Sequence, residues 1–69
     1  MTPRDRRQID LMVSDLAASG VALASRDLVF AHLVANEFSE RIARDHFKDI
    51  VSRAAATRRQ RLLELARAH

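Results

Sequence analysis

The fold is decided by residues 40–66, which read ERIARDHFKDIVSRAAATRRQRLLELA. Apolar residues recur here at the spacing of one helix face: Ile42, Ala43, Phe47, Ile50, Val51 and Ala54. Opposite charges stand four residues apart three times, a spacing worth roughly a few tenths of a kcal/mol per pair in a helix. These pairs are Glu40–Arg44, Arg41–Asp45 and Asp49–Arg53. The pattern predicts one helix, about 40 Å long at about 1.5 Å per residue.

Two shorter helices are predicted before this stretch. The first begins after Thr2 as N-cap, with Pro3 in its first turn, and ends at Gly20 as a left-handed C-cap. Its apolar face consists of Ile9, Met12, Val13 and Leu16. The second follows Ser25 as N-cap and is apolar nearly all round over residues 28–35. A helix of that kind is usually buried, so we expect it to be the central helix of the fold.

A break is predicted between the second and third helices, at residues 36–39. Asn36 tolerates the left-handed conformation, and Ser39 is a suitable N-cap. The alternative is one continuous helix from residue 26 onward. On either reading, we expect four residues at the heart of the core: Phe30, Leu33, Phe47 and Ile50.

Composition supports an all-α fold in one domain, residues 1–69. A chain of 69 residues has room for a single domain, and 48% of it is apolar with only one Gly and one Pro. The only aromatic residues are three phenylalanines, so strands are disfavoured. We therefore predict three helices with a long C-terminal one.

Self-association is predicted from the small size and from the leucines near the C-terminus. A domain this small usually needs a disulfide, a metal or oligomerisation, and there is no Cys. Two short helices cannot cover a third that is about 40 Å long. Leu62, Leu63 and Leu65 would therefore be left bare, and we predict a homodimer through the long helix.

The residues needed for catalysis or for a cofactor are not brought together by the sequence. His46 stands beside Asp45, but His32 belongs to another predicted helix, so no set of metal ligands converges. A single Gly leaves no phosphate-binding loop. We expect no enzyme activity, no metal and no cofactor. No apolar run approaches the roughly 18 residues of a membrane span, and residues 1–8 lack a signal core, so a cytoplasmic location is expected.

The C-terminal third is basic, with Glu64 the only acid after Asp49. Leucines alternate with its arginines, and apolar contact combined with Arg is the composition of protein interface hot spots. We therefore assign partner binding to Arg58, Arg59, Arg61, Leu62 and Leu65. A nucleic-acid surface and a merely solvated helix face remain the alternatives.

A helix–turn–helix is the alternative reading for function. Residues 26–35 would support a recognition helix that offers Arg41, Arg44 and Lys48 to a DNA major groove. The stretch from Ser39 to Asp49 resembles the end of the recognition helix in the TetR family. The turn glycine of that family is replaced here by Glu37-Phe38, and its mid-helix aromatic by Ala43. Four acids in this region would face phosphates unfavourably: Glu37, Glu40, Asp45 and Asp49.

The chain as a whole resembles a group of small phage proteins. From Met-Thr-Pro-Arg-Asp-Arg-Arg-Gln at its start to the Arg-rich C-terminal helix, it is similar to helical early proteins of Pseudomonas-type bacteriophages. Among these it resembles anti-activators that bind a host quorum-sensing receptor and silence it. The resemblance implies a helical dimer in the host cytoplasm that inhibits a host protein, such as a transcription regulator, by direct binding. An antitoxin-like subunit of a small complex is a third possibility.

Overall fold

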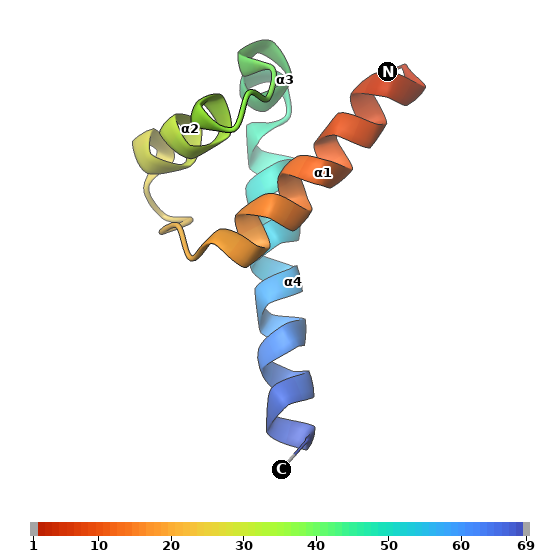
Figure 1. Ribbon diagram of the computed structural model, residues 1–69, viewed down its shortest axis with the longest axis vertical. Helices are drawn as coiled ribbons and strands as arrows, with labels where there is room; N and C mark the ends of the chain where they lie inside the picture. Colours follow the sequence, from red (N-terminus) through yellow and green to blue (C-terminus); the bar gives the residue numbers. More distant parts are fainter. Residues whose placement is uncertain (1, 69) are drawn as a thin grey trace.

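The computed structural model describes residues 2–68, which form four helices and no strand (Figure 1). These are α1 (Pro3–Ser19), α2 (Arg26–Ala35), α3 (Glu40–Asp45) and α4 (Phe47–Arg67). The most extensive contact joins α1 to α4, and α2 and α3 lie together at the end of the molecule where α4 begins. None of the described helices has the length and apolar character needed to cross a membrane. The all-α prediction is confirmed, with four helices in place of three.

The ends of the first two helices lie where the sequence places them. The Thr2 hydroxyl accepts from the backbone N–H of Asp5 at 3.2 Å, and α1 ends at Gly20 with a φ of 77°. The Ser25 hydroxyl accepts from the backbone N–H of Leu28 at 3.3 Å to cap α2. Short polar side chains and one glycine therefore set three of these boundaries by local chemistry.

The break predicted at residues 36–39 is confirmed, and the continuous helix is wrong. α2 ends in a Schellman motif, in which the N–H of Phe38 donates to the carbonyl of Leu33 and that of Glu37 to the carbonyl of Val34. The left-handed residue is Glu37, with a φ of 65°, whereas Asn36 has a φ of −93°. Ser39 then caps α3 as predicted.

The long helix expected over residues 40–66 is divided at His46, which corrects the prediction of three helices. His46 has a φ of −119° and a ψ of 19°, outside the helical range. The change of direction lets α3 pack mainly against α2, while α4 packs against α1 (Figure 1). One straight helix could not make both contacts. Asp and His are also weak helix formers, so Asp45 and His46 give way at little cost.

The core lies where all four helices meet, and α2 is not the central helix. Its members are Ile9, Met12, Val13, Leu16, Val29, Leu33, Ile42, Ala43, Ile50 and Ala54. α2 contributes Val29 and Leu33 to the core, but its Leu28 and Val34 are 55% and 50% exposed. The expectation of a buried α2 is wrong because its neighbours cover only one side of it. An all-round apolar pattern therefore overstated its burial.

The predicted heart of the core is half right. Leu33 and Ile50 are fully buried, as expected. Phe30 and Phe47 are only partly buried and stack on each other, with ring centroids 4.9 Å apart and planes within 2° of parallel. The guanidinium of Arg26 lies 5.5 Å and 5.1 Å from the two ring centroids. The two phenylalanines therefore form the edge of the core, and Arg26 covers them by a cation–π contact.

Candidate functional site

The last part of α4 extends away from the other helices (Figure 1). We call residues 59–67 the projection. Leu62, Leu63 and Leu65, which all lie in it, are 65%, 55% and 62% exposed. Three large apolar side chains in open contact with water on nine residues of helix are unfavourable for an isolated chain. The projection is therefore the strongest candidate for a binding surface.

Two of these leucines continue the face of α4 that is buried higher up. Ile50 and Ala54 are fully buried. Residues three, four, seven and eight positions further along a helix share a face, so Arg58, Leu62 and Leu65 follow Ala54 on the same side. α1 ends at Ser19 and covers this face no further than Arg58. The apolar face of α4 therefore extends beyond the end of α1, the helix that buries it.

Arg58 marks the place where the cover ends. Its guanidinium donates to the backbone carbonyl of Leu16 at 2.8 Å and to that of Ala17 at 3.3 Å. These carbonyls belong to the last turn of α1, which has no basic residue of its own. The Leu16 carbonyl also accepts from the Ser19 hydroxyl at 2.9 Å, and a cation at this helix end interacts favourably with the helix dipole. Of the residues assigned to partner binding, Arg58 is thus used inside the chain, a role that the sequence does not reveal.

A shallow hollow lies at the root of the projection. Its volume is about 220 Å³, and it is lined by Ala17, Arg58, Arg61 and Leu62. It forms beside the end of α1, where α4 continues beyond the helix that covers it (Figure 1). The hollow joins Leu62 and Arg61, two of the residues that the sequence assigns to a partner.

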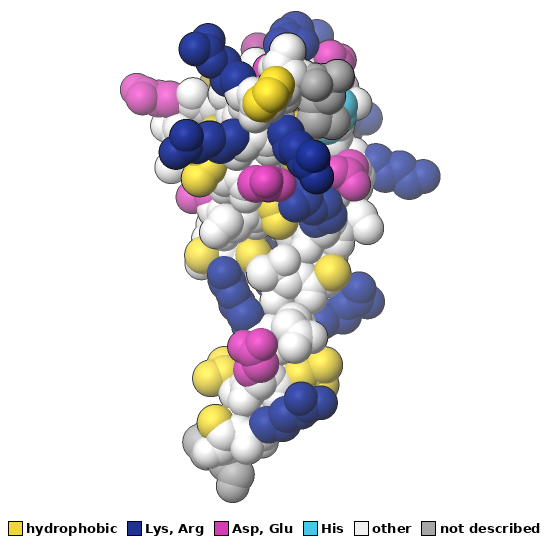
Figure 2. All heavy atoms as spheres, turned by 90° about the vertical axis from the view of Figure 1, so that its right-hand side faces the viewer, with side chains coloured by type: hydrophobic (Ala, Val, Ile, Leu, Met, Phe, Trp, Pro, Cys, Tyr) yellow, Lys and Arg dark blue, Asp and Glu magenta, His cyan; other side chains and the backbone are white. Residues whose placement is uncertain are grey.

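The arginines of the projection are open to solvent. Arg59, Arg61 and Arg67 are exposed. Figure 2 shows basic and hydrophobic side chains interleaved at the narrow end of the molecule. The structure thus brings four of the five predicted partner-binding residues together on an exposed helix end: Arg59, Arg61, Leu62 and Leu65.

The three residues of the DNA-binding alternative are divided between two helices. Arg41 and Arg44 lie on α3, whereas Lys48 follows the turn at His46 and belongs to α4. Arg41 lies 3.8 Å from a carboxylate oxygen of Asp45 and 4.0 Å from one of Asp5. Arg44 pairs with Glu40 at 2.9 Å. The predicted ion pairs of this region are thus present, and both arginines have acidic partners within the chain.

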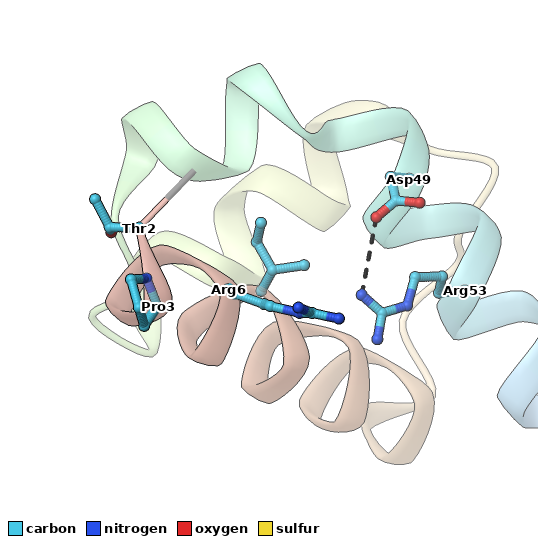
Figure 3. A pocket seen from close by; sticks show the side chains of 6 residues that line it. Thr2, Pro3, Arg6, Asp49 and Arg53 are labelled. Atoms are coloured by element: carbon cyan, nitrogen blue, oxygen red, sulfur yellow. Dashed lines mark ion pairs between the residues drawn. The ribbon is translucent and has the colours of Figure 1, made fainter.

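A second hollow, of about 440 Å³, lies between the start of α1 and α4 (Figure 3). It is lined by Thr2, Pro3, Arg6, Ile9, Asp49 and Arg53. Arg53 donates to Asp10 at 2.8 Å and lies 3.8 Å from Asp49. Its charge is therefore balanced by two carboxylates. Arg6 adds the only lining charge without an ion pair among the described residues, which is too little to define an anion site.

A histidine–carboxylate pair that the sequence did not indicate joins α1 to α2. Nε2 of His32 lies 2.6 Å from a carboxylate oxygen of Asp15, and both side chains are partly exposed. Residues 2–68 contain no group of three or more metal-ligating side chains that could hold an ion. The pair is therefore a hydrogen-bonded contact between α1 and α2.

Comparison with known protein families, with curated proteins and with solved structures finds no match to this chain. The resemblances to phage anti-activators and to the TetR family therefore rest on the sequence alone. The projection, by contrast, is a feature of the molecule's own geometry.

Proposed function

We propose that this is a small regulatory protein that acts by binding another protein through the projection. The observation that carries this is the apolar face of α4, which runs on through Leu62 and Leu65 after α1 has ended. Full burial of a leucine is worth about 1.5–3 kcal/mol, and each of these is nearly two-thirds exposed, so covering both would contribute roughly 2–4 kcal/mol to the binding free energy. Arg59 and Arg61 beside them add the residue type most typical of hot spots.

In its fuller form, the proposal makes the protein a phage-type inhibitor of a host transcription regulator. This class of target comes from the resemblance of the sequence to phage anti-activators. The mechanism would be steric: the bound protein would occupy a surface that the regulator needs for DNA binding or for its own dimerisation. Such a mechanism requires an exposed contact surface and no catalytic group.

The test is affinity capture from a bacterial lysate, with and without nuclease. We expect a stoichiometric protein band that survives nuclease and is lost with Leu62→Gln plus Leu65→Gln. Gln keeps the helix propensity of the site and removes the apolar contact. Leu11→Gln is the matched control, because Leu11 is 53% exposed on α1, outside the projection. Capture of nucleic acid alone, or a band that the double substitution leaves unchanged, would contradict the proposal.

We also propose that the chain self-associates through α4. A second copy laid along the projection would cover Leu62 and Leu65 without any change in the rest of the fold. For a domain of this size, such a contact adds apolar burial that a single copy lacks. In the presence of a target, the same residues would be contested between the target and the second copy.

DNA binding is the second candidate, and one observation favours it. Glu37 is left-handed between α2 and α3, which is the conformation supplied by the glycine of many helix–turn–helix turns. The backbone thus makes such a turn without the glycine. Genomic selection at about 0.15 M salt tests this candidate. A defined site bound at nanomolar concentration, and lost in Arg41→Ala with Arg44→Ala, would favour it over protein binding.

A further inference from the structure

The net charge of the chain is concentrated in the projection and the residue before it. Residues 58–67 hold four arginines and one glutamate, a net charge of +3, which equals the formal charge of the whole chain. Up to residue 57, eight basic residues are therefore balanced by eight acidic ones. Three of these eight basic residues, Arg41, Arg44 and Arg53, pair directly with carboxylates. The chain up to residue 57 is therefore neutral in sum, and the net positive charge lies on a leucine-bearing helix end.

The projection presents an apolar side and a charged side. Leu62, Leu65 and Ala66 stand three and four residues apart and share one side, with Leu63 at its margin. Gln60, Glu64 and Arg67 follow the same spacing on the other side, and Arg59 and Arg61 lie on the two flanks between the sides. Apolar anchors at this spacing are the pattern of a helix that lies in a groove. The charged residues then determine which charge the rim of such a groove must carry.

We infer that the projection is a docking helix for an apolar groove with an acidic rim on a partner protein. The inference rests on the proposed function and specifies the partner's chemistry. Leu62 and Leu65 would lie on the apolar floor, and Arg59 and Arg61, which flank them, would meet carboxylates along the rim. Arginine suits that role because its planar fork pairs with carboxylates in a bidentate manner.

The same charges disfavour the two other occupants. A second copy brings +2 against +2 in the projection, so self-association through it is opposed by charge, whereas an acidic groove is attracted. A nucleic acid would attract the arginines but would set phosphates against the exposed leucines. An acidic, apolar protein surface satisfies both kinds of side chain at once.

Two synthetic helical peptides test the inference on the 69-residue chain. Both carry the same leucine heptads, and their flanking positions are all glutamate in one and all lysine in the other. Like charges keep each peptide from pairing with itself. By fluorescence anisotropy we expect the glutamate peptide to bind at least about tenfold more tightly at low salt, with the ratio falling towards one at about 1 M salt.

Matched variants separate the contributions of the leucines and the arginines. Leu62→Gln with Leu65→Gln should abolish binding of the glutamate peptide, while Leu11→Gln should not change it. Arg59→Gln with Arg61→Gln should weaken binding about tenfold or more. Arg4→Gln with Arg7→Gln removes the same charge from α1, where both residues are exposed, and should weaken it less than about twofold.

Four results would overturn the inference. Equal binding of the two peptides would contradict an acidic partner. It would not contradict the proposed function, because nuclease-resistant capture tests protein binding separately. Binding that survives loss of both leucines would remove the docking helix. A DNA oligonucleotide that displaces the glutamate peptide, and whose own binding ignores the leucine substitutions, would assign the projection to nucleic acid. A dimer that persists at nanomolar concentration and low salt, and that binds neither peptide, would show that a second copy occupies the projection.

Discussion

The guanidinium of Arg58 donates to the backbone carbonyl of Leu16 at 2.8 Å and so joins the middle of α4 to the end of α1. This contact fixes the point at which the cover of α4 stops. We predict that Arg58→Ala lowers the free energy of unfolding by about 1–2 kcal/mol, because charged hydrogen bonds to helix-end carbonyls are lost. Urea denaturation measures the change. Arg59→Ala, at an exposed neighbour, should stay within about 0.5 kcal/mol of the original chain, and equal effects of the two would contradict this role.

The left-handed residue at the end of α2 gives a second prediction. Glu37→Gly should raise the free energy of unfolding by up to about 1 kcal/mol. A side chain at a φ of 65° costs about 1–2 kcal/mol, which glycine avoids. The greater conformational entropy of glycine in the unfolded chain offsets only part of this gain. Ala35→Gly, inside the last turn of α2, is the control and should lower the same quantity by about 1 kcal/mol. Thermal melts compare the two variants. If both lose the same stability, the left-handed conformation of Glu37 is contradicted.

The depth of the core beneath α2 gives a third prediction. Leu33 is fully buried, so Leu33→Ala should cost about 2–5 kcal/mol and leave most of the chain unfolded. Phe30 lies at the edge, and Phe30→Leu should cost only about 1 kcal/mol, chiefly the stacking on Phe47. Circular dichroism against urea compares them. A larger loss from Phe30→Leu would show that the aromatic pair, rather than Leu33, holds α2 in place.

Salt should strengthen self-association, because it screens the repulsion between two basic projections and leaves apolar contact intact. Light scattering at micromolar concentration should show a mass moving from 7.8 kDa towards twice that as salt rises. Leu62→Gln with Leu65→Gln should hold the mass at that of one copy. A mass that stays at that of one copy at every salt concentration would rule out the dimer. A mass that falls as salt rises would show that charge attracts the two copies and does not repel them.

Local signals made much of the fold predictable, and long-range contacts explain what was missed. Thr2, Ser25 and Ser39 cap helices through their own side chains, so neighbouring residues suffice to identify them. The turn at His46 arises because α3 packs mainly against α2 and α4 against α1, and no pattern of neighbouring residues indicates these long-range contacts.

The same distinction holds for the candidate site. The leucines and arginines of the projection were visible as a helical pattern with a charge bias. Their exposure depends on where α1 ends, which Gly20 indicated. The use of Arg58 within the chain was hidden, because its acceptors lie more than 40 residues away.

Photo-crosslinking from position 62 tests most directly whether the projection is where a partner binds. A photoreactive phenylalanine analogue would replace Leu62 in one protein and Leu11 in another, since both leucines are more than half exposed. Illumination in a nuclease-treated bacterial lysate should join the protein carrying the analogue at position 62 to one other protein of defined mass. The protein carrying it at position 11 should give no such product. Identical products from both positions, or none from position 62, would contradict binding through the projection.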